Sequence, residues 1–340
     1  MKKKVIITGI SGQDGSYLAK YLIDKNYKVI GILRKKNLNN LSYLNIKHKI
    51  KYLYCNLSNF KKISLYIKKI KPHLFFNFAG VSSLKDSYKN PLYNDKINNS
   101  AVLNILESIK RFSKKTRFFQ ASSSELYSER ERKKINENSR FNPKSPYSIA
   151  KLSAYYYVNM YRNLYKIYAV NGLLFNHESP LRKKTFITKR IIKELVSYKL
   201  NKNKKKILKI GNIYSSRDWG DTEDYVKVIY KSLKIAKPYD FIICTGKKRS
   251  VKDFINIVAK QLNLKIKWIK TRNSENAIDT ENKKVIIKSS KNLFRDDSLY
   301  NFVGDNSRAK KLLKWKADTE IVKLIKKMIN FEFSHNKINI

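Results

Sequence analysis

Short apolar segments alternate with amphipathic segments along the first half of the chain. Apolar runs rich in Val, Ile, Leu and Phe predict buried β-strands, and stretches with apolar residues every three or four positions predict helices. The predicted strands cover residues 4–8, 27–33, 50–54, 73–79, 117–122 and 168–174. The predicted helices cover residues 15–24, 59–70, 95–112 and 148–166. This alternation predicts an α/β fold with a doubly wound parallel sheet of the Rossmann type.

The rhythm changes in the second half, which predicts a smaller domain built from separate chain segments. We assign residues 1–175 to the sheet domain, with later strand and helix contributions from about 220–250. The smaller, discontinuous C-terminal domain then comprises residues 176–219 and 251–335. The first domain is expected to hold a nucleotide cofactor and the second a substrate.

Several local patterns refine this division. The acidic sequence DTED (221–224) is expected to open a helix, and YDFIICTG (239–246) predicts a buried strand. A lysine-rich stretch covers residues 182–207. The polar segments 200–206 and 272–292 are expected to be loops or solvated turns.

Composition shows that the chain can bury a core and that its charge is unusual. Hydrophobic residues make up 42% of the 340 residues, which argues against disorder. The formal net charge is +48. A basic surface attracts phosphates, so a basic nucleic-acid-binding protein that retains this fold is one interpretation. The lysines are scattered and the chain is rich in residues with AT-rich codons, so we favour compositional drift and expect no specific nucleic-acid partner.

Other residue patterns argue against further classes of protein. Cys55 and Cys244 lie far apart, so we expect neither a disulfide framework nor a zinc site, and the four histidines lack metal-ligand spacing. No stretch approaches the roughly 20 apolar residues of a transmembrane helix. Gln13 and Asp14 end the first apolar run too early for a signal peptide. We therefore expect a cytoplasmic protein without a membrane partner or a metal.

Three evenly spaced glycines follow the first predicted strand. Gly9, Gly12 and Gly15 lie in the sequence ITGISGQDG, between that strand and the helix after it. In such a loop the glycines allow a tight turn, close approach of a pyrophosphate to the backbone, and close packing of helix on strand. The free N–H groups at the helix start then bind the pyrophosphate. The pattern predicts a dinucleotide cofactor.

The end of the second predicted strand indicates which dinucleotide binds. An acidic residue there would bind the ribose hydroxyls of NAD. This chain has Leu33 followed by Arg34, Lys35 and Lys36. Cations at this position suit the 2′-phosphate of NADP, which a guanidinium can bind through two hydrogen bonds. We therefore favour NADP.

A tyrosine and a lysine four residues apart open a predicted helix. Tyr147 and Lys151 belong to PYSIAK (146–151) and share one helix face. Tyrosine has an ordinary pKa near 10, and a nearby ammonium group is expected to lower it. Tyr147 could then take a hydroxyl proton while hydride leaves for a nicotinamide.

A serine-rich segment with one carboxylate follows the predicted strand 117–122. ASSSELY (121–127) then lies at the carboxyl edge of the sheet, where ligands bind in open α/β folds. Ser123 and Ser124 can hydrogen-bond a substrate hydroxyl. Glu125 can take a proton from carbon and return it to a leaving oxygen, which separates a dehydratase from a plain dehydrogenase or epimerase. The alternative is a helix N-cap made of serine and glutamate.

Longer segments resemble one enzyme family. ITGISGQDGSYLA, SSSELY, PYSIAK, NGLLFNHESPLR and GNIYSSRDWGDTEDYV are similar to the GDP-mannose 4,6-dehydratases, which are extended short-chain dehydrogenase/reductases. The resemblance runs from residue 4 to about residue 330. It implies an NADP-dependent lyase that converts GDP-mannose to GDP-4-keto-6-deoxy-mannose and water through transient hydride transfer.

The resemblance also implies a role for individual residues. The catalytic residues it implies are Ser123, Glu125, Tyr147 and Lys151. The cofactor-binding residues it implies are Gly9, Gly12, Gln13, Asp14, Gly15, Arg34, Asn56, Leu57, Tyr147, Lys151, His177 and Arg182. The substrate-binding residues it implies are Ser82, Ser124, Asn176 and Arg217.

Some positions depart from the family's usual residues. AGVSSL (79–84) replaces AAQSHV, so Val81 and Ser83 stand beside the sugar pocket in place of glutamine and histidine. Asn56 stands where an aspartate usually contacts adenine. These changes leave two alternatives open, namely dehydration of a GDP-linked manno-heptose and epimerisation of a nucleotide sugar at carbon 4.

The resemblance bears on assembly as well. The family's serine-rich loop, which supports tetramers, is rewritten here as RKKNLNNLSYL (34–44). We expect a homodimer through the predicted helices 95–112 and 148–166, and a tetramer remains open.

Overall fold

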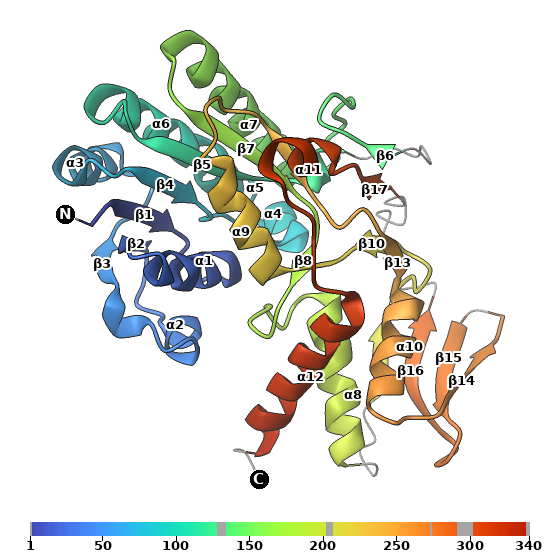
Figure 1. Cartoon of the computed structure of the whole chain (residues 1–340). Coiled ribbons are helices and arrows are strands. Elements are labelled where there is room, and N and C mark those ends of the chain that lie inside the picture. The colour runs from blue at the N-terminus through green and yellow to red at the C-terminus, as the bar shows by residue number, and fades with distance from the viewer. Residues whose placement is uncertain (1, 128–133, 202–206, 273, 291–301, 338–340) are drawn as a thin grey trace.

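A computed structural model describes residues 2–127, 134–201, 207–272, 274–290 and 302–337. Within them, a seven-stranded parallel sheet has the order β12-β7-β5-β4-β1-β2-β3 (Figure 1). Its strands are β1 Lys4–Thr8, β2 Lys28–Leu33, β3 Lys51–Tyr54, β4 Leu74–Asn77, β5 Arg117–Ser123, β7 Ala169–Leu174 and β12 Phe241–Ile243. The strand order reverses between β1 and β4. In such sheets a ligand binds outside the carboxyl ends of the strands at the reversal.

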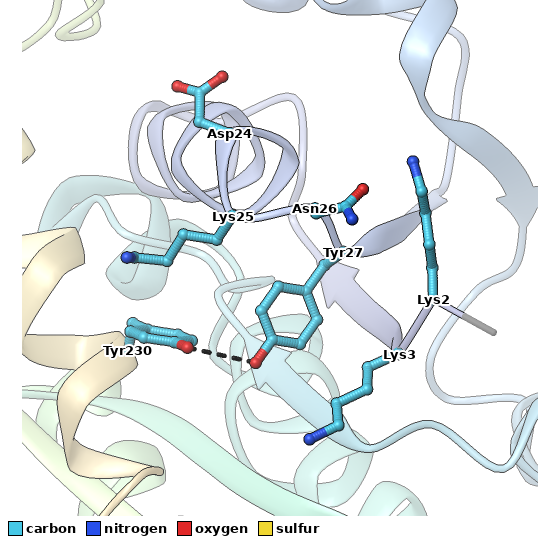
Figure 2. Close-up of a pocket in the computed structure, with 7 residues that line it drawn as sticks. All are labelled: Lys2, Lys3, Asp24, Lys25, Asn26, Tyr27 and Tyr230. Atoms are coloured by element: carbon cyan, nitrogen blue, oxygen red, sulfur yellow. Dashed lines mark hydrogen bonds between the residues drawn. The ribbon is translucent and has the colours of Figure 1, made fainter.

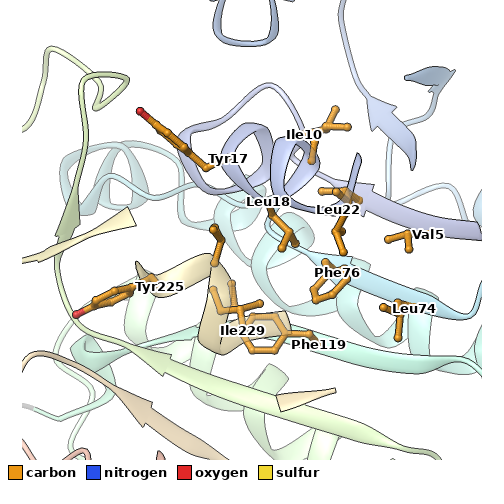
Figure 3. Packing of buried hydrophobic residues seen from close by; sticks show 14 of the residues in the cluster. Val5, Ile10, Tyr17, Leu18, Leu22, Leu74, Phe76, Phe119, Tyr225 and Ile229 are labelled. Carbon is orange, nitrogen blue, oxygen red and sulfur yellow. The ribbon is translucent and has the colours of Figure 1, made fainter. Parts of the chain in front are cut away.

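Neighbouring residues of the central strands point to opposite faces of the sheet, and helices cover both faces. Ile7 and Phe76 pack under α1 and α9 in one core (Figure 3). Ile6 and Phe75 pack against α3, α6 and α7 in another core. Because both faces are buried, these strands have continuous apolar runs, and the predicted doubly wound fold is confirmed. The five helices are α1 Gln13–Asp24, α3 Phe60–Ile70, α6 Ala101–Phe112, α7 Pro146–Tyr165 and α9 Thr222–Ser232.

A second sheet lies at the other end of the molecule, beside three helices (Figure 1). Its strand order is β14-β15-β16-β9, with bounds Ile266–Lys270, Ser274–Asp279, Lys284–Ser290 and Leu208–Ile210. The helices are α8 Ile187–Leu200, α10 Val251–Gln261 and α12 Ile321–Lys337. Ile192, Phe254, Ile287 and Leu324 lie in the hydrophobic core shared by these elements, and each is buried.

One loop prediction in this part of the chain is wrong. Residues 272–292 were expected to be loops or solvated turns, but β15 and β16 run through them as an antiparallel pair. Burial alternates along Ser274–Asp279, and the buried positions are Glu275, Ala277 and Asp279, so two acidic residues lie on the inner face of this strand. β14 precedes β15 in the chain and pairs with it, whereas β9, which pairs with β16, is distant in sequence. The lysine-rich stretch 182–207 contains helix α8, and residues 202–206 of the predicted loop lie outside the described residues.

Short elements connect the two sheets and complete the fold. Two-stranded ribbons pair β8 His177–Glu178 with β11 Gly220–Asp221, β10 Ser216–Asp218 with β13 Lys248–Ser250, and β6 Lys134–Ile135 with β17 Val303–Gly304. The short helical segments are α2 Asn39–Tyr43, η1 Lys47–Lys49, α4 Leu84–Lys89, α5 Pro91–Asp95, η2 Lys96–Ser100, η3 Ser124–Leu126 and α11 Ser307–Leu313. Within the described segments, no helix is both long and apolar enough to span a bilayer.

Candidate active site

The glycine loop lies between β1 and α1, at the strand-order reversal. Gly9 has φ +65°, and a Cβ there would lie 2.7 Å from the Ala79 backbone nitrogen. A Cβ on Gly15 would lie 2.4 Å from the Gly9 carbonyl oxygen. Gly12 is the N-cap of α1 and makes no side-chain cap hydrogen bond. The loop therefore presents backbone N–H groups at a helix start in a space that only small residues leave open, which fits a pyrophosphate.

The residues expected to bind the adenosine half follow β2 and β3. Arg34 is exposed just after β2, and its guanidinium donates a hydrogen bond to the Tyr93 hydroxyl of α5. Asn56 is exposed after β3 and accepts a hydrogen bond from the Ser58 N–H at 3.2 Å. Leu57 is buried. The residue after β2 is therefore a cation instead of an acid, and it lies at the same edge of the sheet as the glycine loop.

Hydrogen bonds join the start of α1 to the segment after β7. The His177 Nε2 and Asp14 Oδ1 atoms are 2.8 Å apart, and His177 Nδ1 donates to the Phe175 carbonyl at 2.8 Å. Gln13 donates to the His177 carbonyl at 3.0 Å and accepts from the Ser179 hydroxyl at 2.8 Å. Gln13, Asp14 and His177 are therefore brought together, and they hold the glycine loop against β8.

The Asp14–His177 pair is charged. Burial lowers the pKa of His177, but the charge of Asp14 and its hydrogen bond outweigh burial and raise that pKa above 6.5. Burial would raise the pKa of Asp14, but the charge and hydrogen bond of His177 lower it below 3.8. Because a carbonyl and a carboxylate can only accept, both ring nitrogens of His177 act as donors.

Arg182 lies on the same segment as His177. Its Nε atom is 3.0 Å from Glu178 Oε2, and its guanidinium carbon lies 3.6 Å from the centre of the Phe186 ring. The Thr188 hydroxyl also donates to Glu178, at 2.8 Å. Burial nevertheless raises the pKa of Glu178, against the Arg182 charge. Arg182 is thus held in place by a carboxylate and an aromatic ring.

The four residues expected to be catalytic come together where β5 ends and α7 begins. Ser123 ends β5 and accepts a hydrogen bond from the Glu125 N–H at 3.1 Å. A side-chain hydrogen bond also joins Ser123 to Tyr147, in the first turn of α7. Lys151 lies one turn later, with Nζ 5.9 Å from the centre of the Tyr147 ring. The serine–glutamate cap and the predicted acid–base centre are therefore the same structure.

The start of α7 holds the tyrosine by a reciprocal cap. Ser145 accepts a hydrogen bond from the Ser148 N–H at 3.1 Å, and the Ser148 hydroxyl accepts one from the Ser145 N–H at 2.9 Å. Pro146 occupies the first helical position, where its missing N–H has no partner to lose. This sequence fixes the helix start, and with it the position of Tyr147.

The expected lowering of the tyrosine pKa is wrong for this structure. Burial raises the pKa of Tyr147 to about 12, and the Glu125 carboxylate adds to the rise, although the Ser123 hydrogen bond opposes it. Lys151 does not offset this, because its ammonium donates to the Ala121 carbonyl at 2.8 Å. Burial also lowers the pKa of Lys151 to about 8, against the Asp14 carboxylate. Glu125 and Tyr147 therefore influence each other electrostatically.

A buried asparagine that sequence reasoning missed supports this centre. The Asn98 side chain accepts from the Val81 N–H at 3.2 Å, and donates to the Val81 carbonyl at 3.1 Å and to Asn94 at 2.7 Å. Asn94 in turn donates to the Pro146 carbonyl at 2.8 Å. The two amides thus join the loop after β4 to the start of α7. The sequence carries no signal for this, because the hydrogen-bond partners are loop backbone groups brought close by the fold.

The residues expected to bind substrate lie around the ends of β4, β5 and β7. Ser82 is exposed, Ser124 is buried in η3, and Asn176 follows β7 and is partly buried. Arg217 lies on β10, and its Nη1 donates to the Ser215 hydroxyl and the Ser216 carbonyl, both at 2.8 Å. Arg249 is its partner on β13. The described part of the chain contains no group of three or more His, Cys, Asp or Glu side chains that could hold a metal.

Comparison with known proteins agrees with this geometry. The family model described as GDP-mannose 4,6 dehydratase matches residues 6–328. A GDP-mannose 4,6 dehydratase of Dictyostelium discoideum is 34% identical, over 99% of this chain and 97% of its own. A GDP-mannose 4,6-dehydratase of Sinorhizobium fredii is 31% identical, over 98% and 97% of the two chains.

Solved structures share the fold. A dTDP-glucose 4,6-dehydratase of Bacillus anthracis in complex with NAD has a TM-score of 0.81 at 17% identity, covering 98% of each chain. A UDP-glucose 4-epimerase of Thermotoga maritima has a TM-score of 0.81 at 17% identity, covering 98% of this chain and 99% of its own. With the full-length sequence matches, these findings show that the chain belongs to the GDP-mannose 4,6-dehydratase family.

Proposed function

We propose that this chain removes water from GDP-mannose to form GDP-4-keto-6-deoxy-mannose. The observation that carries the proposal is that Glu125, just after β5, and Tyr147, at the start of α7, lie near enough for the Glu125 charge to raise the pKa of Tyr147. An epimerase or a plain dehydrogenase needs the tyrosine but has no use for the second acid–base group. The family match over residues 6–328 supports the same reaction.

A bound nicotinamide would supply the hydride acceptor for carbon 4 and the hydride donor for carbon 6. Tyr147, assisted by Ser123, takes the proton of the 4-hydroxyl. Glu125 takes the proton on carbon 5, which the neighbouring ketone acidifies, and passes it to the departing 6-hydroxyl, which leaves as water. With a pKa of about 12, Tyr147 is protonated near neutral pH, so its basic form needs a stabilising cation, and Lys151, one helical turn away, can supply that charge.

We propose NADP as the cofactor. The glycine loop fits the pyrophosphate, and Arg34 with Lys35 and Lys36 supports the 2′-phosphate. Asn56, Leu57, His177 and Arg182 complete this site, although His177 acts through Asp14 because both its ring nitrogens are already engaged. Replacing Arg34 with glutamine should weaken NADP binding about tenfold and leave NAD binding unchanged, as measured by titration. Equal effects on the two cofactors would contradict the proposal.

We further propose that the two parts of the chain divide the work. Residues 1–175, with 220–250, would hold NADP, and residues 176–219 and 251–335 would hold the GDP-sugar. Along the chain, Asn176 and Arg217 lie beside the boundaries of these parts at 175/176 and 219/220, and a guanidinium there would suit the diphosphate. Ser82 and Ser124 would contact the sugar.

An exposed apolar stripe supports a homodimer. Ile149, Tyr156, Met160 and Leu164 lie along one side of α7, and they are 58%, 57%, 41% and 63% exposed. Seven- and four-residue spacing puts them on one helix face, as in helix pairs that pack along their length. Replacing Leu164 with lysine should convert dimer to monomer in light scattering, whereas the same change at exposed Leu312 should not. A monomeric wild-type protein would contradict this proposal.

The direct test is mass spectrometry of the product formed from GDP-mannose with NADP. Loss of one water is expected, while a 4-epimerase would leave the mass unchanged. Glu125→Gln should keep cofactor affinity within about twofold and lower turnover by about 10²–10⁴-fold, the usual contribution of a general acid–base group. Glu320→Gln, an exposed change of the same kind before α12, is the matched control. Unchanged product formation by Glu125→Gln would refute the role of Glu125.

A further inference from the structure

An open cavity lies at the edge of the large sheet where β1 begins, opposite the edge that carries the glycine loop. It has a volume of about 640 Å³ and is lined by Lys2, Lys3, Asp24, Lys25, Asn26, Tyr27 and Tyr230 (Figure 2). These residues surround the start of β1 and the carboxyl ends of α1 and α9, whereas Gly9 follows the other end of β1. The volume is within the range of small-molecule sites. Neither the cofactor nor the sugar site uses any of these residues.

Lysine side chains and two phenol hydroxyls line this cavity. The Tyr27 and Tyr230 hydroxyl oxygens are 3.2 Å apart. The Lys25 Nζ lies 5.7 Å from the centre of the Tyr230 ring (Figure 2), and the Lys234 Nζ lies 5.6 Å from it. Lys234 also donates to the Tyr27 hydroxyl at 3.5 Å. The two tyrosines therefore contact two ammonium groups, of which Lys25 lines the cavity and Lys234 lies next to the lining residues.

The positive charge here is not neutralised by neighbouring acids. In the described part of the chain, Lys2, Lys3, Lys25 and Lys234 form no salt bridge, although several other lysines do. Asp24 is the one carboxylate lining the cavity, and it points to the far side of the helix end (Figure 2).

The helix ends alone do not account for these lysines. Lysines near a helix carboxyl end often compensate its dipole, and each such end carries about half a negative charge. Two helix ends and Asp24 therefore offset about two of the four lysine charges. About two positive charges remain, together with phenol hydroxyls that can donate hydrogen bonds.

We propose that this cavity binds a polyphosphate group, either inorganic pyrophosphate or the phosphate chain of a nucleotide. Such an anion takes several charge-assisted hydrogen bonds at once, which a set of ammonium groups and hydroxyls provides. Lys25 is the residue that caps the carboxyl end of α1, and Tyr230 belongs to α9. A bound anion would therefore bridge two helices that pack against each other. Binding therefore stabilises the folded protein against heat.

Isothermal titration of the full chain with pyrophosphate, at low salt and without added nucleotide, tests the proposal. One saturable site that depends on Lys25 and Lys234 is expected, whereas any pyrophosphate bound at the glycine loop should persist in a variant that lacks these two lysines. The double variant K25Q/K234Q should weaken binding about tenfold, because two ammonium contacts are lost. The matched control K267Q/K270Q removes the same charge from exposed positions on β14, far from the cavity, and should change affinity less than about twofold.

Further titrations, with a tyrosine variant and with ATP, identify the ligand and test the hydroxyl groups of the site. Y27F/Y230F keeps every charge and should weaken binding by removing the hydroxyls. ATP that binds about tenfold more tightly than pyrophosphate would indicate a nucleotide, and equal affinities would indicate the phosphate group alone. The proposal is overturned if no saturable binding occurs, if K25Q/K234Q binds like wild type, or if the K267Q/K270Q control loses as much affinity. The last result would mean general attraction by the +48 charge.

Discussion

Replacing Asn98 with alanine tests whether one buried amide holds the loop after β4 in the active site. Asn98 is fully buried and makes three hydrogen bonds, two to the Val81 backbone and one to Asn94. Alanine removes all three and leaves the Val81 N–H and carbonyl without this partner. The loop then loses its connection to the start of α7.

The expected cost follows from these contacts. Each lost hydrogen bond contributes about 1 kcal/mol, and each buried polar group left without a partner costs about 1–3 kcal/mol. Because Val81 is only partly buried, we assign about 3 kcal/mol to the three hydrogen bonds and at most about 2 kcal/mol to the groups left without a partner, so Asn98→Ala should lower the free energy of unfolding by about 3–5 kcal/mol. At roughly 2 °C per kcal/mol for a protein of this size, the midpoint should fall by about 6–10 °C. Because the loop carries Ser82 and Ser83, kcat/KM for GDP-mannose should fall at least about tenfold.

Thermal unfolding followed by circular dichroism, together with steady-state kinetics, checks both effects. Asn99→Ala is the matched control, because Asn99 lies in the same turn but makes its hydrogen bond to the exposed Asp95, at 3.0 Å. That variant should lose under about 1 kcal/mol and keep its KM. The reasoning is refuted if the two variants are equally stable, or if Asn98→Ala is unstable but has wild-type kcat/KM.

Three further predictions concern buried charges. Asp14→Asn should lower the pKa of His177, measured by NMR titration of the imidazole, because the Asp14 charge keeps that pKa above 6.5. The stabilisation from this pair is fully present between about pH 3.8 and pH 6.5, and it is lost as the pH rises through the raised pKa of His177 or falls through the lowered pKa of Asp14. Lys151 has a pKa of about 8 instead of 10.5, so unfolding takes up a proton between these values. The wild type should therefore gain about 3 kcal/mol over Lys151→Met as the pH rises from 8 to 10.5. Asp240→Ala should cost about 3–5 kcal/mol in urea unfolding, because it removes the buried carboxylate that pairs with the partly buried Arg162 and accepts a hydrogen bond from the Asn171 N–H.

Each of these predictions has a contrary result. An unchanged His177 titration in Asp14→Asn would mean that another group raises its pKa. A constant stability difference between Lys151→Met and wild type over that pH range would mean that burial does not shift the lysine. Glu281→Ala breaks an exposed pair with Lys265 at 3.5 Å and should cost under about 1 kcal/mol. A loss as large as that of Asp240→Ala would contradict the burial argument.

Local patterns predicted the large sheet and the local elements that carry the candidate site. The strands are buried on both faces, so each is a continuous apolar run that can be read without knowing its neighbours. The loop of Gly9, Gly12 and Gly15 and the start of α7 are also local, since turn geometry and capping depend on a few adjacent residues. Ser123 and Tyr147 meet because β5 and α7 each end or begin where their own sequence dictates.

Contacts between distant segments decided the rest. The strands at residues 274–290 belong to a sheet that includes β9, about 80 residues earlier in the chain, and their polar residues are typical of a loop. Asn98 supports the site because it hydrogen-bonds Val81, in a loop seventeen residues earlier in the chain.

The electrostatics of the site were likewise invisible in the sequence. The spacing of Tyr147 and Lys151 suggested a lowered tyrosine pKa, but burial, the Glu125 charge and the Ala121 carbonyl produced the opposite result. Residue spacing along the chain determines which groups can share a helix face. Desolvation and charge–charge interaction depend on everything packed around those groups, and only the folded structure brings those neighbours together.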